Sequence, residues 1–515
     1  MSATLAPAPA PAAPNAAAED GRWRVWRRLG RMSTIQRFML ALMLAYVAKQ
    51  AFSVFLYPAF SGHDEVAHYS HIRTLATEGR LPTLPNLAQW RAVAATGQTP
   101  PTDQLPAELY PYCRFVLDWY CEPANERWAR TPPRIVTVLG QLYPSGYDYT
   151  ANHPPLYYAV MTPIYWLTRA LSPVAQQYIF RLLAIPFGAA TVWLAYRLAM
   201  TIFPGDAFLA VTTAALVAFQ PQISYEAAMV NNDITSIVLY AWMTLLLARG
   251  IRDKFPYRLC LWLGVGLGLA LLTKGTSLSA APAIALAIIL ATGWRDGRTW
   301  ATKGFLAAAP AAVLAAPWYL YLYRTYGNFD ALPQVAALQW WNSPAGTFLG
   351  MLTSRDFIVM RFRETWGEFG WRLISLSPAL LATIAIPTAV CLAGLVVYVV
   401  TGGRDPGAAA VGRPERPAVW QWQAIATMGA LCVFAYLAVI QFGTTFSLTQ
   451  ARYFFPVVNA GAFLSMLGLR TIVPPRMRPA AQGIVVAALV VLMILIFTQY
   501  VLPFGVSSHG EPGFG

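Results

Sequence analysis

The sequence predicts an all-α protein that crosses a membrane many times, and three observations support this fold class. Of its 515 residues, 57 % are hydrophobic and only 12 % are charged, whereas a soluble domain carries about 25 % charged residues. Apolar runs of about 20 residues, the length of a membrane-spanning helix, recur along the chain. Basic residues gather at the ends of these runs, which is typical of membrane topology. Together these observations exclude a water-soluble fold.

The formal net charge of +14 does not indicate a nucleic-acid-binding protein. The basic side chains lie at the ends of apolar runs, where they meet lipid headgroups, rather than on one surface suited to reading bases. We therefore expect the lipid bilayer, and no nucleic acid, as the partner of these charges.

The first segment, residues 1–36, is rich in Ala and Pro and then basic, and we expect a disordered tail without a cleavable signal peptide. Its arginines precede the first apolar run, so the positive-inside rule places this tail in the cytoplasm. Further basic clusters mark other cytoplasmic turns: Arg249/Arg252/Lys254/Arg258, Arg295/Arg298/Lys303, Arg404/Arg413/Arg416 and Arg470/Arg476/Arg478.

About eleven spans satisfy all of these turns. They form one transmembrane domain, 37–503, and leave a short extracytoplasmic tail, 504–515. The predicted spans are 37–57, 177–202, 207–225, 232–250, 258–276, 278–294, 304–323, 374–400, 419–441, 453–470 and 480–503.

Residues 155–171 form an apolar segment that disturbs this threading. The segment is short, aromatic and interrupted by Pro163, so we interpret it as an interfacial or re-entrant helix. If it crossed the membrane, every later basic cluster would move outside unless a second break restored the order. The alternative is therefore a true span compensated by an incomplete crossing around 207–235, which gives about 12–13 helices in all.

The unusual polar residues fall on the outer side in this threading. They lie in a large first outer loop, 58–154, in a second one, 324–373, and at the outer ends of several spans. Charged groups close to hydrocarbon cost free energy unless they are solvated, paired or bound, about 2.5–3.5 kcal/mol for an Asp at the centre of a helix. We therefore expect the chemistry at the extracytoplasmic face.

Residues 62–71, Gly-His-Asp-Glu-Val-Ala-His-Tyr-Ser-His, stand where the first span emerges. On a helix Asp64, His68 and His71 share one face, and Glu65 points about 100° away. Asp64 is a candidate general base for an acceptor hydroxyl, with Glu65 and His68 in support. Three donors on one face are also half of a metal site, so a divalent cation is the one cofactor that the motif suggests. The alternative is a solvated helix whose acids mark the water boundary.

Residues 152–158, Asn-His-Pro-Pro-Leu-Tyr-Tyr, end the first outer loop. The two prolines fix φ and start the next helix at a defined angle, which makes His153 a candidate for substrate binding near the interface. Tyr157 is a further candidate, although Tyr157 and Tyr158 also fit an aromatic belt, which we favour for them.

The turn 220–233 carries two carboxylates, Glu226 and Asp233, seven positions apart. In a helical turn both face one side, where they would bind a cation or sugar hydroxyls. The alternative is a simple cap, with Asn232 or Asp233 at the N-terminus of the next span.

Lys274 and Arg452 are cations on the acidic outer side, where the positive-inside rule does not require them. A rim cation needs an anion, and a lipid phosphate or diphosphate is the natural one; snorkelling is the alternative. Tyr453, next to Arg452, joins the substrate-binding candidates. The second outer loop interleaves aromatic and charged residues, which suits carbohydrate and a lipid interface equally: Trp340, Trp341, Arg361, Arg363, Glu364, Trp366, Glu368 and Trp371.

Two of the five cysteines, Cys113 and Cys121, lie eight positions apart in the first outer loop. They either pair in an oxidising compartment or stay free. The other three, Cys260, Cys391 and Cys432, are expected to be small core residues of the spans.

Four of these motifs, taken together, resemble the GT-C superfamily of integral-membrane glycosyltransferases. The resemblance is closest to the lipid A aminoarabinose transferases, the protein O-mannosyltransferase-like enzymes and the DUF2142-like proteins. No single motif is specific, but their order and spacing over 37–470 are. The motifs are Asp64-Glu65-x-x-His68, His153-Pro154-Pro155-Leu156-Tyr157-Tyr158, Leu272-Thr273-Lys274-Gly275 and Arg452-Tyr453-Phe454-Phe455-Pro456.

The resemblance implies a GT-C-like helix bundle and a sugar donor linked to polyprenyl phosphate, used at the outer face of the cytoplasmic membrane. It implies Asp64 in the catalytic position, with Lys274 and Arg452 near the donor phosphate. The acceptor, a lipid, glycan or protein of the cell envelope, stays open, because we see no sizeable soluble domain after the last span such as some relatives carry.

The predicted function is therefore a hexosyl- or pentosyltransferase that moves a sugar from a polyprenyl-phosphate donor to an envelope acceptor. The alternative is a transporter or flippase of a lipid-linked glycan, a class that often shows inverted repeats and charges at mid-membrane. Here the charges gather at one edge of the membrane instead. A non-catalytic assembly scaffold is a third interpretation.

Overall fold

The computed structural model describes residues 32–115, 134–370, 372–405, 415–447 and 449–509. Within them, nine helical segments are long and apolar enough to cross a membrane, and two shorter apolar helices accompany them. The long segments are α2 (Thr34–Leu56), α7 (Pro173–Ile202), α10 (Asp233–Arg252), η3 with α12 (Gly275–Thr292), α13 (Gly297–Tyr326), α17 (Pro378–Val400), α18 (Val419–Gly443), η5 with α19 (Ala451–Ile472) and the run Pro475–Val506. The short ones are α8 (Ala207–Phe219) and α11 (Tyr257–Leu271). These segments coincide with the predicted spans, so the predicted all-α polytopic membrane fold is confirmed.

The other elements connect these helices or subdivide them. β1 pairs with β2 in an antiparallel hairpin, with Ile135 opposite Pro144, and β3 pairs with β4, also antiparallel. The elements are α3 (Glu65–Glu78), α4 (Leu87–Ala94), η1 (Ala107–Phe115), β1 (Ile135–Val138), β2 (Gln141–Pro144), η2 (Tyr149–Asn152), α6 (Leu156–Thr168), α9 (Pro221–Glu226), η3 (Gly275–Ser279), α12 (Ala280–Thr292), α14 (Leu332–Leu338), α15 (Phe348–Thr353), α16 (Arg355–Gly367), β3 (Glu368–Phe369), β4 (Ile374–Ser375), η5 (Ala451–Val457), α19 (Val458–Ile472), η6 (Pro475–Met477), α20 (Arg478–Ile496), η7 (Phe497–Val501) and α21 (Leu502–His509).

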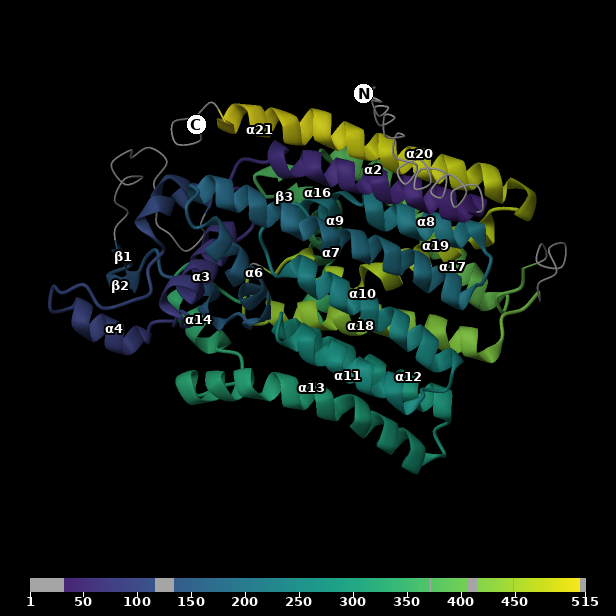
Figure 1. The fold of residues 1–515 in the computed structure, drawn as a ribbon, viewed down its shortest axis with the longest axis horizontal. Coiled ribbons are helices and arrows are strands. Elements are labelled where there is room, and N and C mark those ends of the chain that lie inside the picture. The colour runs from purple at the N-terminus through teal and green to yellow at the C-terminus, as the bar shows by residue number, and fades with distance from the viewer. Residues whose placement is uncertain (1–31, 116–133, 371, 406–414, 448, 510–515) are drawn as a thin grey trace, which may run out of the picture.

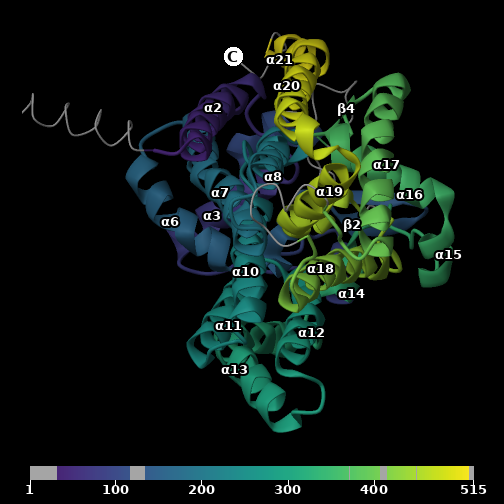
Figure 2. The same ribbon diagram turned by 90° about the vertical axis from the view of Figure 1, so that its right-hand side faces the viewer.

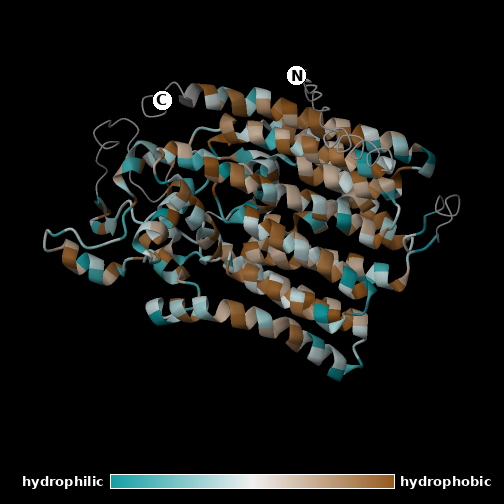
Figure 3. Cartoon of the chain, viewed as in Figure 1, coloured by the Kyte–Doolittle hydropathy of each residue, from teal (hydrophilic) through white to brown (hydrophobic). Residues whose placement is uncertain are grey.

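The long helices run side by side, so the bundle has two ends of different character (Figure 1). α3, α4, α6, α14 and the β1–β2 hairpin gather at the left of the view, which we call the α3 end. The turns that carry the basic clusters lie at the opposite end, which we call the basic end. Figure 3 shows hydrophobic residues concentrated along the helix bodies. The polar loops and the basic turns are thus separated as predicted, and which end faces the cytoplasm stays a prediction.

Two helix pairs approach so closely that only glycine fits between them. A Cβ atom on Gly264 of α11 would lie 2.2 Å from the carbonyl oxygen of Ala307 in α13. A Cβ atom on Gly394 of α17 would lie 2.1 Å from the carbonyl oxygen of Gly468 in α19. Membrane helices associate through such close contacts, because lipid provides no hydrophobic driving force between them. Small residues therefore help to set the lateral order in Figure 2, where α13 lies beside α11 and α12 at one edge and α2 and α20 lie at the other.

The short helix α6 accounts for the segment 155–171. Its 13 residues extend about 20 Å, less than the thickness of about 30 Å that a span must cross. α6 packs against α3, and the indole nitrogen of Trp166 donates to the carbonyl oxygen of Ala76 at 2.8 Å. The contacts with α3 agree with the interfacial interpretation. Length alone does not separate the two interpretations, because α8, which coincides with a predicted span, also has 13 residues.

The segment after α8 corrects one predicted boundary. The sequence predicts a continuous span over 207–225 that ends in an exposed turn, but α8 stops at Phe219, and Glu226 and Asp233 are buried. The cause is Pro221, because the residue before a proline avoids the α conformation. Gln220 is accordingly extended, and its side chain caps α9 by accepting from the backbone of Ile223.

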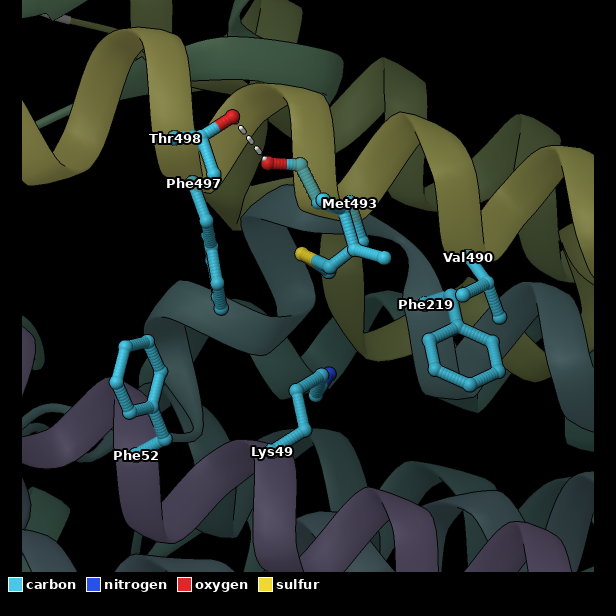
Figure 4. A pocket seen from close by; sticks show the side chains of 8 residues that line it. Lys49, Phe52, Phe219, Val490, Met493, Phe497 and Thr498 are labelled. Atoms are coloured by element: carbon cyan, nitrogen blue, oxygen red, sulfur yellow. Dashed lines mark hydrogen bonds between the residues drawn. The ribbon is translucent and has the colours of Figure 1, made fainter.

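Lys49 and Gln50 of α2 hold this break together within the bundle. Lys49 Nζ donates to the carbonyl oxygen of Ala218 and to Ser224 Oγ, both at 2.6 Å, and the amide of Gln50 donates to the carbonyl oxygen of Ser224 at 2.9 Å. A helix can break at membrane depth only if such groups satisfy its carbonyls. Lys49 also lines an apolar cavity of about 370 Å³ against α20 (Figure 4). The hydrogen bonds of Lys49 to the break after α8 explain why a lysine lies beside this apolar cavity.

The cysteines show one predicted role and leave another untested. Cys260, Cys391 and Cys432 are free and lie within the spans, as expected. The predicted Cys113–Cys121 pair lies outside the described residues, since Cys121 belongs to the segment 116–133.

Candidate active site

Asp64 lies at the junction between α2 and α3, just before the first residue of α3. Its backbone is left-handed, with φ 58°, and its side chain does not cap the helix. Instead Oδ1 accepts from the hydroxyl of Tyr149 at 2.7 Å, and Oδ2 accepts from Nη2 of Arg452 at 2.7 Å. A non-glycine residue held in this region costs about 1–3 kcal/mol, and such strain clusters at functional sites. The contacts of the Asp64 side chain therefore override the backbone preference.

The environment of Asp64 keeps it ionised. Burial by itself raises the pKa of this carboxyl, but the charge of Arg452 and the hydrogen bonds from Arg452 and Tyr149 outweigh burial. The net pKa of Asp64 lies well below its usual range. Asp64 is consequently a permanent anion and a weak base.

Arg452 and Lys274 meet at Asp233. Arg452 in η5 bridges two carboxylates, since its Nη1 lies 3.7 Å from Oδ2 of Asp233. Lys274, in the link between α11 and η3, forms an ion pair with Asp233 from the other side. Both cations also lie near the ring of Tyr453, at 5.4 Å for Arg452 and 4.6 Å for Lys274. Lys274 is 13 % exposed and Arg452 only 7 %, so Lys274 is the more exposed of the two cations.

Glu226 lies at the end of α9, fully buried beside these groups. Its Oε2 accepts from the side-chain amide of Asn231 at 3.1 Å, and its Oε1 lies 3.8 Å from Nδ1 of His63. Burial, with the nearby charge of Asp233, raises the pKa of Glu226 to about 8. Burial, with the charge of Arg452, lowers the pKa of His63 to about 3. We call Asp64, Glu226, Asp233, Lys274 and Arg452 the outer cluster.

Glu65 does not join the outer cluster, although the sequence places it with Asp64 as a supporting catalytic residue. It faces Arg181 of α7, with Nε to Oε1 at 2.9 Å and Nη2 to Oε2 at 2.5 Å, and both side chains are completely buried. Glu65 also accepts from the backbone of Val230, and Arg181 donates to the carbonyl oxygen of Tyr57. The pair therefore ties α2, α3, α7 and the segment before α10 together. Sequence reasoning missed Arg181, whose signal was an arginine inside an apolar run rather than at its end.

The histidines and tyrosines form a second buried group around Tyr158. The hydroxyl of Tyr158 lies 2.9 Å from Nδ1 of His68 and 3.1 Å from Nδ1 of His153. The ring of His71 stacks on that of Tyr158 at 3.5 Å, and Tyr157 lies edge-on to His68. Burial lowers the pKa of His68 to about 3 and that of His153 to about 4, so both are neutral. The favoured belt interpretation of the two tyrosines is wrong, because both are buried inside the protein.

The predicted metal donors do not converge. Nδ1 of His68 faces Tyr158, Nδ1 of His71 faces Thr150 at 3.2 Å, and both oxygens of Asp64 are occupied by Arg452 and Tyr149. Within the described parts of the chain, no group of three or more His, Cys, Asp or Glu residues is arranged to hold a metal ion. We therefore assign no step to a metal.

The charges of the second outer loop support η5. Oε2 of Glu364 in α16 accepts from the backbone of Ala451 at 2.9 Å, and Arg361 pairs with Glu364 and donates to the carbonyl oxygen of Thr449. Arg372 pairs with the same Glu364. These charges position the segment that carries Arg452, whereas the sequence suggested contacts with carbohydrate or with a lipid interface for them. Trp371 lies outside the described residues.

A comparison with protein-family models matches part of the chain. Residues 152–321 match the family model described as dolichyl-phosphate-mannose-protein mannosyltransferase, a stretch that contains His153, Glu226, Asp233 and Lys274. Comparison with curated protein sequences gives no match.

Solved structures also resemble the chain at low sequence identity. ArnT from Cupriavidus metallidurans bound to undecaprenyl phosphate is 14 % identical over 90 % of this chain and 73 % of that one, with a TM-score of 0.47. Its apo state gives the same identity and coverage with a TM-score of 0.48. The Archaeoglobus fulgidus oligosaccharyltransferase in complex with Zn and sulfate is 13 % identical over 92 % of this chain and 52 % of that one, with a TM-score of 0.46.

The family match supports the resemblance that the four sequence motifs predict. The motifs lie on a bundle of apolar helices, and three of the four contribute a residue to the outer cluster. The protein is a multi-pass membrane protein that resembles the GT-C superfamily of glycosyltransferases.

Proposed function

We propose that this protein transfers a sugar from a polyprenyl-phosphate donor to an envelope acceptor at the α3 end, which faces the outside of the cytoplasmic membrane. The observation that carries the proposal is the meeting of Asp64 with Arg452, 388 positions later in the chain, beside Lys274 and Asp233. Two cations and their carboxylates are thus concentrated at the end of an apolar bundle. A donor with an isoprenoid tail cannot leave the bilayer, so its enzyme needs a site at this height.

The cations suit a leaving phosphate. Transfer of the sugar leaves negative charge on the phosphate, and fixed cations in a water-poor site stabilise developing charge strongly. Lys274, the more exposed of the two, would meet the donor first, and Arg452 lies deeper. The description of the matched family names dolichyl phosphate mannose, an isoprenoid phosphate sugar, which supports this donor class.

Asp64 organises the site in this proposal. It holds Arg452 through one oxygen and Tyr149 through the other, and an acceptor hydroxyl that displaces Tyr149 would be oriented by the same carboxylate. The neutral histidines around Tyr158 border the site and offer hydrogen bonds to sugar hydroxyls.

The test is transfer by purified protein in proteoliposomes supplied with polyprenyl phosphate carrying a radiolabelled hexose or pentose, with envelope extract as the acceptor. Asp64→Asn is expected to abolish transfer while leaving the protein folded and inserted. Asp103→Asn is the matched control, because Asp103 is an outer-loop carboxylate paired with Arg80 outside the cluster. Full activity of Asp64→Asn would reject the proposal, and label that crosses the bilayer without a new glycosidic bond would favour a flippase.

Mass spectrometry of envelope lipids and glycans after deletion of the gene would identify the substrates. Loss of one decoration names both the sugar and its acceptor. An unchanged envelope under conditions in which the gene is expressed would count against the proposal.

A further inference from the structure

The charges of the outer cluster do not balance. It contains three carboxylates, Asp64, Asp233 and Glu226, but only two cations, Arg452 and Lys274. Arg452 pairs with Asp64 at 2.7 Å and approaches Asp233 at 3.7 Å, and Lys274 pairs with Asp233. Within the described part of the chain, Glu226 forms no ion pair with a lysine or arginine; its one titratable contact is His63 at 3.8 Å. Glu226 is therefore the surplus carboxylate.

The surplus carboxylate has an unused oxygen. Asn231 donates to Oε2 of Glu226 and accepts from the backbone of Ile234, so the amide orientation is fixed. Among the described residues, none donates a hydrogen bond to Oε1, although the side chain is completely buried. An ionised carboxylate buried without a cation costs several kcal/mol, and such a group takes up a proton instead. The unused oxygen and the surplus negative charge therefore favour a protonated Glu226, whereas Asp64 is ionised.

The position of Glu226 relative to Asp64 is tightly held. The hydroxyl of Tyr225, the residue before Glu226, accepts from the backbone of His63, the residue before Asp64, at 3.1 Å. The same hydroxyl accepts from the backbone of Gly370 at 3.1 Å. One tyrosine therefore fixes the spacing between the segments that carry the two carboxylates.

We propose that Glu226, rather than Asp64, accepts the proton of the acceptor hydroxyl during transfer. This inference rests on the function proposed above. In the fraction of the enzyme whose Glu226 has released its own proton to solvent, the acceptor O–H bond breaks and its proton moves to Oε1 of Glu226, while the oxygen electron pair forms the new bond to the anomeric carbon. The bond from that carbon to the phosphate oxygen breaks, and its electron pair leaves on the phosphate, where Arg452 and Lys274 receive the charge. Asp64 stays ionised throughout and holds Arg452.

The titration of Glu226 agrees with this role. A general base works best when its pKa lies near the working pH, and burial raises the pKa of Glu226 to about 8, whereas the pKa of Asp64 lies far below. The deprotonated form of Glu226, which can act as the base, is therefore populated as the pH rises through about 8. The charged or titratable groups around Glu226 come from every neighbouring segment: Tyr57, His63, Asp64, Tyr225, Asp233, Lys274 and Arg452.

The experiment compares pH profiles of kcat/KM between pH 5.5 and 9.5 for the wild type, Glu226→Gln, Glu226→Asp and Glu368→Gln, with the labelled polyprenyl-phosphate sugar that the wild type uses. The wild type is expected to rise about tenfold per pH unit below an apparent pKa near 8 and to level off above it. The kcat/KM of Glu226→Gln should be at least about 100-fold lower than that of the wild type. It should also no longer rise with pH. Glu368→Gln is the matched control, a buried glutamate paired with Arg363 outside the cluster, and should keep the wild-type profile.

The outcomes separate this inference from the proposed function. Absence of transfer by the wild type counts against the proposed function. If the wild type is active and Glu226→Gln is equally active with the same pH profile, only the role of Glu226 is overturned. If the Gln variant does not fold, Glu226→Asp decides: the inference expects a slower enzyme with a displaced pH midpoint, and an unchanged midpoint overturns it.

Discussion

The two ends of this bundle each contain a buried network of ion pairs, and the networks differ in charge balance. At the basic end Arg470 donates to Asp206 at 2.7 Å and pairs with Asp405, which Arg478 also binds at 2.8 Å. Among the described residues, two cations of that network face two carboxylates. In the outer cluster, two cations face three carboxylates.

The balanced network has a clear structural task. Asp206 caps α8 by accepting from the backbone of Leu209. Arg470 lies in the last turn of α19, Asp405 follows α17 and Arg478 begins α20. The network therefore fastens four helices at their basic ends. The unbalanced outer cluster keeps a surplus carboxylate and a partly exposed lysine, which a purely structural network does not need. We therefore interpret the surplus carboxylate as a mark of the functional end of the bundle.

The largest expected effect tests this comparison directly. Arg452 and Arg470 each bridge two buried aspartates, so Arg452→Gln and Arg470→Gln are a matched pair. Arg452→Gln should lower kcat/KM by about 10²–10³-fold, because charge on the leaving phosphate loses its stabiliser. Arg470→Gln should instead lower the free energy of unfolding by about 3–5 kcal/mol and leave turnover per folded molecule unchanged. Equal losses of turnover in both variants would remove the distinction between the ends.

A stability effect of similar size is expected inside the α3 end. Glu65→Gln removes one charge of the fully buried pair with Arg181. The free energy of unfolding in detergent should therefore fall by about 3–5 kcal/mol. The folded fraction should retain its specific activity, since Glu65 does not contact the outer cluster. A variant with normal thermal stability and no activity would restore the catalytic role that the sequence suggested for Glu65.

A smaller effect is expected at the rim. Lys274→Gln should raise KM for the donor about tenfold, equivalent to about 1.4 kcal/mol, with a modest change in kcat. Lys254→Gln provides the control, because Lys254 is an exposed lysine at the basic end. Steady-state kinetics at several donor concentrations would measure both, and an unchanged KM for Lys274→Gln would remove this lysine from donor binding.

The smallest effect is expected for the hydroxyl that holds Asp64. Tyr149→Phe deletes one hydrogen bond to a carboxylate that Arg452 still holds, so activity should fall only a few-fold, by about 1 kcal/mol. Tyr143→Phe, in the exposed hairpin, should have no effect on the same assay. A loss as large as that of Asp64→Asn would mean that Tyr149 itself takes part in transfer.

The helices were predictable because their signals are local. Apolar length and flanking basic residues identify each span without knowledge of its neighbours, and the predicted segments coincide with those observed. The break after Phe219 escaped this reasoning, since a hydropathy run continues through Pro221 while the backbone does not. Its support comes from Lys49 on α2, and nothing near Pro221 in the sequence points to that residue.

The candidate site was predictable only in part. Sidedness placed Asp64, Asp233, Lys274 and Arg452 on one face, because a charge at the end of a span must lie at one membrane surface or the other. It did not distinguish Glu65 from Asp64, adjacent carboxylates whose side chains leave the same turn in different directions. Arg181, which forms the ion pair with Glu65, lies 116 positions away in the chain.

The sequence by itself determined the class of protein, the positions and order of most of its apolar helices and the end at which its unusual charges collect. These properties follow from composition and from distance along the chain. Tertiary packing alone decided which carboxylate received which cation, and so which of them was left with a proton. Electrostatic energy in a water-poor interior depends on separations of a few ångströms in space, and those separations exist only after helices far apart in the chain have packed together.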